Sequence, residues 1–345
     1  MNLAEALRDQ AVHCAALGSP FMARMLPMLA ELWPAGSALD AAILAFEGNI
    51  GPMGHSLPLR LAAGLHALVL TGRDAGLIAT YPPHDAPDAA MGDALTSALR
   101  DHEAFMIDWI TSPPQTNEVR RSAVLIPGLH QIAGMTGATR VTMSELGASA
   151  GLNLMFDRFA LESEAGRLGP DDPALVMTPD WDGPLPDAVQ FEVVDRRGVD
   201  LNPLDPHDAD HALRLRSYLW PDQPHRMALT DAAIQANTAQ VDRGDAVDWL
   251  ERRLEDVPER QLHLIYHTIA WQYFPQERQE IGAALIAAAG ARATEDAPLA
   301  WLRMEADDKR RGAAVTARIW PGDHEIFLGR ADFHGRWVEW SAPRA

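Results

Sequence analysis

The spacing of apolar residues divides the chain into two regions. From residue 2 to about residue 110, apolar side chains recur at intervals of three and four, as in AEALRDQAVHCAALG and SALDAAILAFEG, and Gly and Pro separate the successive stretches. This spacing places the apolar side chains on one face of a helix. We therefore predict an all-helical region over residues 1–114 and a second domain over residues 115–345.

The second region has short apolar runs that alternate with helical stretches. The runs of strand character are RVTMSELG (140–147), AVQFEVVD (188–195), QLHLIYHT (261–268) and PLAWLRME (298–305). GLNLMFDRFAL, directly after the first run, is expected to be a helix. Alternating strands and helices predict an α/β, Rossmann-like domain with a doubly wound parallel sheet behind the all-α N-terminal region.

The last part of the chain has a different pattern. AAVTARIW and EIFLGRADF flank a turn at Gly322 and Asp323, and GRWVEW follows them. This arrangement predicts a β-hairpin and antiparallel strands at one side of the sheet. Residues 162–187 are rich in Pro, Gly and Asp, so we expect a loop there, either an insertion over the sheet edge or a lid.

Composition and charge narrow the classes of partner. The 29 Lys and Arg residues against 48 Asp and Glu residues give a net charge of −19, which repels phosphate backbones and anionic lipid. The longest apolar run, at 61–70, is half a membrane span. The single Cys14 offers no thiolate cluster for zinc and indicates a reducing compartment. We expect a cytoplasmic protein with no nucleic-acid partner, no membrane partner and no metal; the oligomeric state stays open.

Candidate functional residues follow the predicted strands, because ligands of open α/β sheets bind at the carboxyl ends of the strands. After the first strand, small residues in ELGASAG let a ligand approach the backbone, and the next helix is expected to offer free N–H donors. Asp200, in RGVDLNP, is placed to accept hydrogen bonds from the two hydroxyls of a ribose, or else forms a turn ahead of the proline. Asp245, in RGDA, could accept a bond from an exocyclic amine such as that of adenine, or cap the following helix.

The same glycine loop also matches the G-x-S-x-G elbow of serine hydrolases, with Ser149 as the nucleophile. Such an elbow normally follows several strands that carry an oxyanion loop. Everything before residue 140 has a helical pattern and contains no His-Gly-Gly run. A hydrolase and a cofactor-binding module without turnover therefore stand as alternatives to a catalytic cofactor site.

Residues around the third predicted strand and before the glycine loop complete the candidate site. His267 is the candidate catalytic base, the alternative being a histidine hydrogen-bonded at the strand end. Trp271 and Tyr273 are candidates for the substrate pocket, or else core aromatics. Asn117 and Glu118 are assigned to the same pocket because they precede the helix that leads to the first strand.

The three loop motifs occur in an order that resembles class I S-adenosylmethionine-dependent methyltransferases, over about residues 115–340. The resemblance implies a seven-stranded sheet, S-adenosylmethionine as cofactor, and methyl transfer to a small-molecule or protein acceptor. It assigns cofactor contacts to Glu145, Gly147, Ser149, Gly151 and Asn153 in the glycine loop, to Asp200 at the ribose and to Asp245 at the adenine. The chain lacks the Asn/Asp-Pro-Pro-Tyr signature that methylation of amino groups often uses, so the resemblance does not assign the methyl acceptor.

At a closer level the chain is similar to an uncharacterised bacterial family, domain of unknown function 2332. The shared segments are SLPLRLAAGLHALVLTGR (56–73), QTNEV (115–119), ELGASAGLNL, RGVDLNP, the Trp220–Pro221 pair and RGDAVDWL. They span most of the chain, but the family has no assigned activity. The similarity therefore identifies relatives and adds no reaction.

Overall fold

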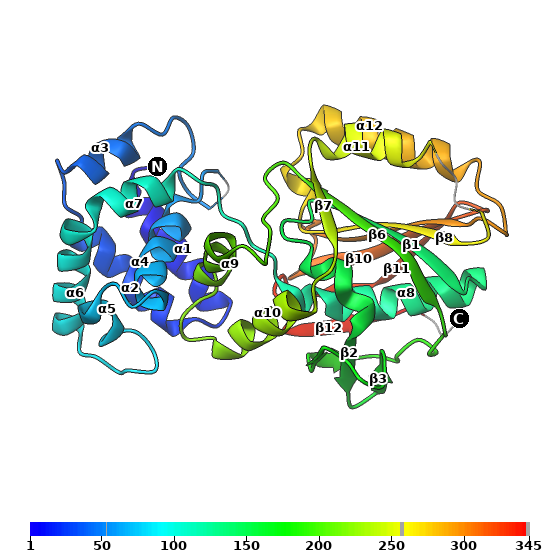
Figure 1. Ribbon diagram of the computed structural model, residues 1–345, viewed down its shortest axis with the longest axis horizontal. Coiled ribbons are helices and arrows are strands. Elements are labelled where there is room, and N and C mark those ends of the chain that lie inside the picture. Colours follow the sequence, from blue (N-terminus) through cyan, green and yellow to red (C-terminus); the bar gives the residue numbers. More distant parts are fainter. Residues whose placement is uncertain (53, 256–258, 343–345) are drawn as a thin grey trace. The chain divides into compact units, whose positions relative to one another are not determined.

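A computed structural model describes residues 1–52, 54–255 and 259–342, which form two compact units (Figure 1). The helical unit contains residues 1–116 and 206–228, and the sheet unit contains residues 117–205 and those from 229 on. The sequence pattern placed 206–228 in the second domain. These residues belong to the helical unit because Tyr218 packs with Ala63, Ala67 and Trp109 in one buried cluster.

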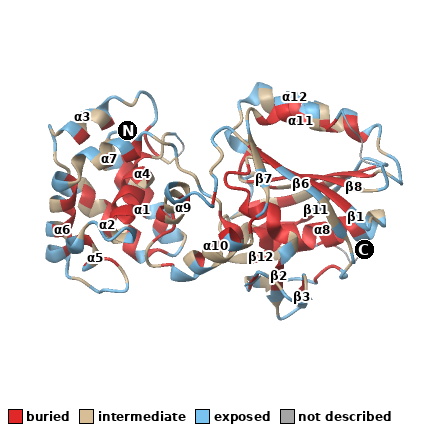
Figure 2. Cartoon of the chain, viewed as in Figure 1, coloured by how far each residue is buried: buried red, intermediate tan, exposed pale blue. Residues whose placement is uncertain are grey.

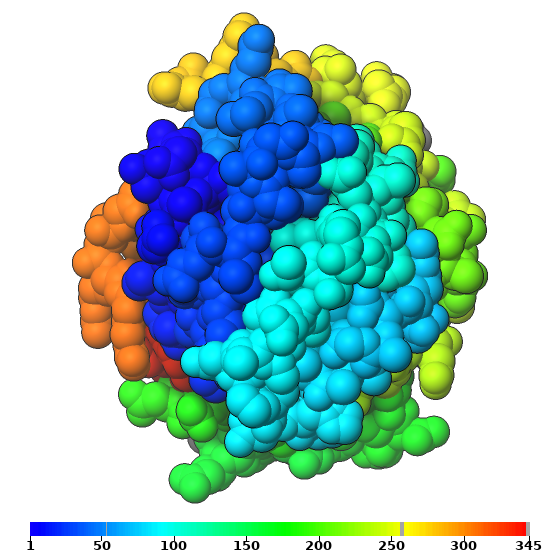
Figure 3. Space-filling model, turned by 90° about the vertical axis from the view of Figure 1, so that its left-hand side faces the viewer, coloured from blue at the N-terminus to red at the C-terminus, as the bar shows by residue number. Residues whose placement is uncertain are grey.

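The helical unit is built around α4, which is buried along almost all of its length (Figure 2). Its helices are α1 Leu3–Ala16, α2 Pro20–Glu31, α3 Ala38–Leu44, α4 Leu57–Leu70, α5 Ala75–Ile78, α6 Asp88–Asp101, α7 Glu103–Ile110 and α9 Ala209–Ser217. Side chains of Asn2, Ser19 and Ser37 cap the first turns of α1 to α3 and so define where these helices begin. The residues of the N-terminal helices are coloured blue to cyan in Figure 3.

The sheet unit contains a nine-stranded sheet in the order β5-β12-β11-β10-β9-β8-β1-β6-β7. The strands are β1 Arg140–Leu146, β5 Asp180–Asp182, β6 Glu192–Asp200, β7 Gln240–Arg243, β8 Leu262–Thr268, β9 Leu299–Glu305, β10 Ala313–Trp320, β11 His324–Ala331 and β12 Trp337–Trp340. Strands β7, β6, β1, β8 and β9 run parallel, and β10 to β12 continue as antiparallel neighbours.

Taken in chain order, the parallel strands follow the sequence 3-2-1-4-5, which is the order of a doubly wound sheet. The predicted α/β class and the antiparallel end of the chain are confirmed. The sheet has nine strands, however, where the resemblance implied seven. One of the additional strands, β5, comes from the segment expected to be a loop, and Trp181 in it stacks on Trp340 of β12.

Helices cover both faces of the sheet: α8 Ser122–Thr136 lies on one face, and α11 Ala246–Arg253 and α12 Gln276–Gly290 lie on the other (Figure 1). Helix α10 Pro224–Ala236 crosses the boundary between the units. Strands β1 and β8 are buried almost completely, as their apolar runs predicted. No helix in the described part of the chain is long and apolar enough to span a bilayer.

The helix expected directly after β1 is only partly formed. Residues Leu152–Arg158 make a 3-10 helix, η2, and Phe159–Ser163 form β2. Strand β2 lies between β3 Gly166–Leu168 and β4 Leu175–Met177 in a separate small sheet. Pairing with segments further along the chain thus outweighs the local helical pattern. Two further 3-10 turns are η1 Val119–Arg121 and η3 Trp271–Tyr273.

Candidate functional site

The glycine loop lies at the end of β1, where the strand order of the sheet reverses between β1 and β8. Three of its residues have a positive φ: Gly147 and Gly151 at 71° and Ser149 at 54°. Glycine adopts this left-handed region readily, whereas serine seldom does. The path of the loop therefore requires its two glycines, and Ser149 is held in an uncommon conformation at the predicted ligand site.

The N–H groups of this loop bond within the protein. Gly147 and Ala148 donate to the Val199 carbonyl at 2.9 and 3.0 Å, and Ser149 donates to Asp200 Oδ2 at 2.9 Å. The bonds fix the loop to the end of β6, so a ligand here would be recognised largely by side chains. Free N–H donors were predicted for the start of the next helix; there the Leu152 N–H donates to Asn117 Oδ1 at 2.9 Å and the Leu154 N–H donates to the Gly151 carbonyl at 3.1 Å.

Asn117, Glu118 and Asn153 are brought together beside the loop. Asn117 Oδ1 accepts the Leu152 N–H at 2.9 Å, which anchors the start of η2. The Asn153 side chain accepts from the Ser122 hydroxyl at 2.8 Å and donates to the Glu118 carbonyl at 3.2 Å, and it is fully buried. These contacts give Asn117 and Asn153 a bracing role, because each ties the loop to the segment that precedes α8.

Glu145, the last but one residue of β1, is 2% exposed. Its Oε2 makes no hydrogen bond to any residue in the described part of the chain. Burial raises the pKa of this carboxyl well above its usual range, and the negative charge of Asp200 raises it further, against smaller opposing effects of Arg121 and Tyr266. A buried acceptor without a partner is costly, so the site is suited to a ligand that brings a cation or a donor.

Asp200 ends β6, the strand next to β1, and is half-buried. One carboxylate oxygen accepts the Asn202 N–H at 2.8 Å, and the other accepts the Ser149 N–H. A carboxylate oxygen can accept two hydrogen bonds, so these contacts leave acceptor capacity on each oxygen. The structure thus places Asp200 beside the glycine loop, at the sheet edge where a ribose was predicted.

Asp245 follows β7, a four-residue strand that the apolar pattern did not reveal. Its Oδ1 caps α11 by accepting the N–H groups of Val247 at 2.8 Å and Asp248 at 3.2 Å, and Arg278 forms an ion pair with it. The helix-capping alternative accounts for these bonds. Contact of Asp245 with adenine stays a prediction.

His267 is completely buried at the end of β8. Its Nδ1 lies 2.6 Å from Glu305 Oε1, and the Trp301 indole N–H donates to its Nε2 at 3.1 Å. An Nε2 that accepts leaves the proton on Nδ1, which donates it to the carboxylate. Both ring nitrogens are thus engaged, so this geometry offers no lone pair to a substrate proton and matches the alternative of a histidine bonded at the strand end.

Glu305, which the sequence analysis did not single out, organises the loop after β8. Its Oε1 also accepts the N–H groups of Ala270 at 2.9 Å and Trp271 at 3.0 Å. Burial by itself raises the pKa of Glu305, but the bonds from His267 and the two N–H groups outweigh it, and the net pKa is lowered. These contacts hold Ile269 at a φ of 51°, which is rare for a β-branched residue.

The remaining predicted pocket residues lie in this loop. Trp271 stacks on the His267 ring with centroids 5.0 Å apart, and it is partly buried. Tyr273 is 66% exposed and so is not a core residue. Glu305 could have been found from the sequence by the rule that identified the other candidates, because it ends a predicted strand at the ligand-binding edge.

A buried carboxylate, Glu145, and a half-buried one, Glu305, therefore flank β8 at the carboxyl edge of the sheet. Glu305 Oε2, like Glu145 Oε2, lacks a hydrogen-bond partner among the described residues. Both features favour a ligand with positive charge or several donors. No group of three or more His, Cys, Asp or Glu side chains within residues 1–52, 54–255 and 259–342 is arranged to hold a metal ion.

The hydrolase alternative requires a histidine for Ser149. The strand, the left-handed serine and the short helix after it resemble a nucleophile elbow. His267 is engaged by Glu305, however, and His263 Nε2 lies 2.8 Å from the Ser144 hydroxyl inside the sheet. The bonds of these two β8 histidines therefore direct them to partners other than Ser149.

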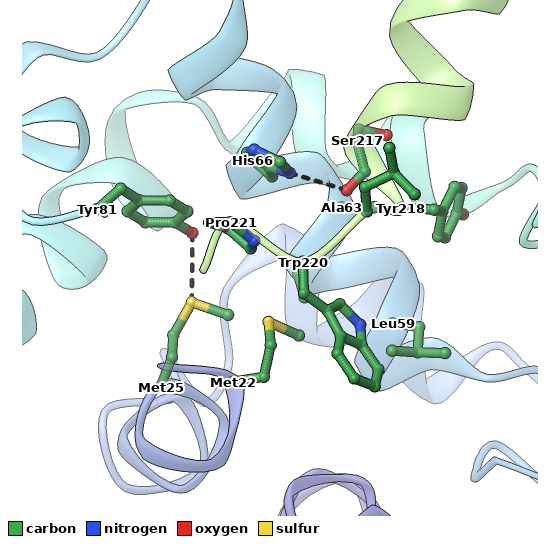
Figure 4. A pocket seen from close by; sticks show the side chains of 12 residues that line it. Met22, Met25, Leu59, Ala63, His66, Tyr81, Ser217, Tyr218, Trp220 and Pro221 are labelled. Carbon is green, nitrogen blue, oxygen red and sulfur yellow. Dashed lines mark hydrogen bonds between the residues drawn. The ribbon is translucent and has the colours of Figure 1, made fainter. Parts of the chain in front are cut away.

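The helical unit contains a small cavity of about 10 Å³ (Figure 4). His66 Nδ1 lies 3.1 Å from the Ser217 carbonyl, and the Tyr81 hydroxyl donates to the Met25 sulfur at 3.2 Å. Trp220, from the shared Trp-Pro pair, lines the same cavity. A space of this volume holds about one water molecule, so the cavity is too small for an organic ligand.

Comparison with known proteins assigns the chain to a family. No curated protein matches this chain, and no solved structure matches it. One family model matches residues 4–340, which is nearly the whole chain and confirms the similarity seen in its sequence motifs. The chain belongs to the family described as uncharacterized protein conserved in bacteria (DUF2332).

Proposed function

We propose that this protein is an S-adenosylmethionine-dependent methyltransferase that acts on a small-molecule or protein acceptor. The observation that carries the proposal is the buried, unpartnered Oε2 of Glu145 at the reversal point of a doubly wound sheet. Asp200 lies at the end of the adjacent strand, and the glycine loop joins the two positions. The order of the three loop motifs further supports a methyltransferase-type domain.

The chemistry of these side chains fits the cofactor. S-adenosylmethionine carries a positive α-ammonium group and a positive sulfonium, and a cation close to Glu145 would favour the ionised carboxylate against burial and the charge of Asp200. Glu145 would hold the ammonium group, and the acceptor capacity left on Asp200 would hold the ribose hydroxyls. The net charge of −19 also favours a cationic ligand over an anionic one.

The sulfonium of the cofactor supplies a methyl group that is already activated, so the protein mainly has to position the reactants. His267 serves this purpose indirectly, since its bonds to Glu305 and Trp301 fix the loop after β8. Trp271, stacked on that ring, is the residue of this loop best placed to line the acceptor pocket. A proton lost by the acceptor would pass to solvent or to a group on the acceptor.

The direct test is thermal unfolding of the protein with S-adenosylmethionine and with S-adenosylhomocysteine, which lacks the sulfonium charge. A ligand at 100 times its Kd stabilises by about 2.7 kcal/mol, enough to raise the Tm by several degrees. E145Q and D200N should each weaken binding about 10-fold or more, because each removes a charged partner. Methyl transfer is then assayed on acceptor panels.

Matched controls separate binding from general stability effects. E251Q and D187N make the same chemical changes at exposed positions and should keep the full shift. The proposal fails if neither ligand raises the Tm and none is carried through purification. It also fails if E145Q and D200N respond to the ligands as E251Q and D187N do.

The left-handed backbone of Ser149 favours a second candidate, a serine hydrolase. A fluorophosphonate probe that labels the wild-type protein but not S149A would support it over the methyltransferase. Cofactor binding without transfer to any acceptor would instead support a binding module that lacks turnover.

A further inference from the structure

The sheet unit contains a cavity of about 210 Å³, which lies at the amino end of the parallel strands. Residues 189–191 form one of its walls and directly precede β6, whose first residue pairs with Arg140, the first residue of β1. Glu145 and Asp200 are at the opposite ends of these strands. The cavity shares no lining residue with the candidate cofactor site, although Phe156, which lines the cavity, packs against Tyr266, the β8 residue paired with Glu145.

The walls of this cavity combine aromatic and aliphatic side chains with polar groups. Phe156, Phe159 and Phe191 line it together with Ile126 of α8. Phe156 and Phe159 are almost completely buried, and Phe156 also packs edge-on against Tyr266, which fixes the position of its ring. Binding pockets for small molecules combine apolar and aromatic walls with oriented polar groups; this cavity has both, and polar groups make up the larger part of its accessible surface.

His130 supplies an oriented polar group. It is 7% exposed, and its Nδ1 accepts the Val189 N–H at 3.0 Å. Burial lowers the His130 pKa to about 4, so the ring is neutral at pH 7 and its one proton is on Nε2. Nε2 makes no hydrogen bond to any residue within the described part of the chain, so the ring has a donor available in a cavity that it lines.

The charges near the cavity are balanced. Asp157 lines it, but Arg196 pairs with both oxygens of this carboxylate, one of the distances being 2.9 Å, and Arg158 lies 3.6 Å away. Asp171 and Gln190 are exposed and contribute polar groups at the rim. No buried unpaired charge is present among the described lining residues, so neither a cation nor an anion is specifically favoured.

We propose that this cavity binds a small uncharged aromatic or heteroaromatic molecule, whose acceptor atom receives the His130 Nε2–H. The ring system would pack against the partly exposed Phe191, and the buried rings of Phe156 and Phe159 would support that wall from behind. The volume suits a molecule of about two fused rings. The cavity shares no residue with the proposed cofactor site, although Phe156 and Asp157 lie on η2, the same 3-10 helix as Asn153.

The test uses coumarin, an uncharged bicyclic molecule with a carbonyl acceptor, and naphthalene, which has a similar shape and no acceptor. The full chain is labelled at the Ile δ1-methyl groups, and the Ile126 signal is assigned with I126V. We expect saturable movement of the Ile126 signal with coumarin. Affinity for coumarin should exceed that for naphthalene about five- to tenfold, the effect of one hydrogen bond.

Two variants identify the donor. Asparagine at position 130 can still accept the Val189 N–H through Oδ1 but lacks the donor at the position of Nε2, so H130N should lose the preference for coumarin. H84N, the same change at an exposed histidine, should keep it. E145Q should also bind coumarin as the wild-type protein does, which separates this result from the cofactor test.

Absence of a saturable Ile126 shift in the wild-type protein would overturn the proposal, and that experiment needs no variant to fold. Equal affinity of the wild-type protein for coumarin and naphthalene would overturn the role of His130. A preference that persists unchanged in H130N would do the same.

Discussion

At the scale of single residues, the candidate site is defined by carboxylates whose hydrogen bonding is incomplete. Glu145 and Glu305 end or nearly end their strands, and each has one oxygen without a partner in the described part of the chain. Their protonation differs, because the Glu145 pKa is raised while that of Glu305 is lowered by its bonds. One carboxylate therefore favours its neutral form, and the other is held as an anion.

The raised pKa of Glu145 predicts an effect of pH on stability. The folded protein retains this proton at pH values where the unfolded chain has lost it, so the stabilisation is complete below the unfolded pKa and is lost as pH rises through the folded pKa. E145Q removes the ionisation. In urea unfolding without ligand, its free energy of unfolding relative to wild type should be higher at pH 8 than at pH 5.

E251Q provides the control for this measurement, because it makes the same chemical change at an exposed glutamate. Its difference from wild type should be the same at both pH values. A difference for E145Q that does not change with pH would mean that Glu145 ionises in the folded protein as readily as in the unfolded chain.

At the scale of elements, the candidate site depends on the close approach of two loops. A Cβ at Gly147, after β1, would lie 2.7 Å from the Ala270 Cβ, after β8. Glu305 holds the second loop through two N–H groups, and Val199 holds the first. Neither loop can move outward without breaking hydrogen bonds, so the switch point of the sheet is rigid.

G147A should therefore lower the free energy of unfolding more than an alanine substitution at another glycine with a similar positive φ. Gly137, which ends α8, has a φ of 67°, close to the 71° of Gly147, but a Cβ there would meet no atom within 4 Å. G137A should cost about 1–2 kcal/mol from the left-handed backbone. G147A should cost about 1–3 kcal/mol more from the contact with Ala270.

Urea unfolding of the two variants measures this difference. Equal losses of stability in G137A and G147A would show that the loop after β8 moves away at no cost. G147A should also weaken the thermal shift produced by S-adenosylmethionine if the two loops together form the cofactor site.

At the scale of the whole molecule, buried histidines are distributed over both units. Burial lowers the pKa of His66 and His130 to about 4 and that of His263 to about 3. His66 lies in the helical unit, and the other two lie in the sheet unit. All three rings are neutral in the folded protein near neutral pH, whereas each ring in the unfolded chain gains a proton as the pH falls below about 6.5.

This distribution predicts loss of stability in mild acid. Since the folded-state pKa values are depressed, the unfolded chain binds more protons between pH 6.5 and 4, and the free energy of unfolding falls as the pH is lowered through this window. The cost is on the order of 2 kcal/mol per histidine at pH 5. Glu145 acts in the opposite direction, so single substitutions are needed to isolate each histidine.

H263Q should reduce the loss of stability between pH 7 and pH 5, as measured by urea unfolding at both pH values. Glutamine cannot be protonated in this range and can still reach the Ser144 hydroxyl. H324Q, at an exposed histidine, should lose as much stability as the wild-type protein. An unchanged pH dependence in H263Q would show that His263 is charged in the folded state.

The sequence alone determined the elements that depend on neighbouring residues. Helices α1 to α4, the stretch that forms α6 and α7, and the parallel strands β1, β8 and β9 follow from local periodicity, because neighbouring residues determine whether one helix face or a whole strand can be buried. The four-residue α5 did not follow from it. Ligands of open α/β sheets bind at the carboxyl ends of the strands, and this rule makes Glu145 and Asp200 candidate site residues from the sequence alone.

Tertiary structure alone decided the features that join distant segments. Strands β3 to β5 and β7 have three or four residues, too few for a period, and exist because partners elsewhere in the chain pair with them. The transfer of residues 206–228 to the helical unit, the bonds that occupy His267 and the cavity lined by His130 likewise depend on residues far apart in sequence. Their positions follow from packing and hydrogen bonding across the chain, which no local pattern contains.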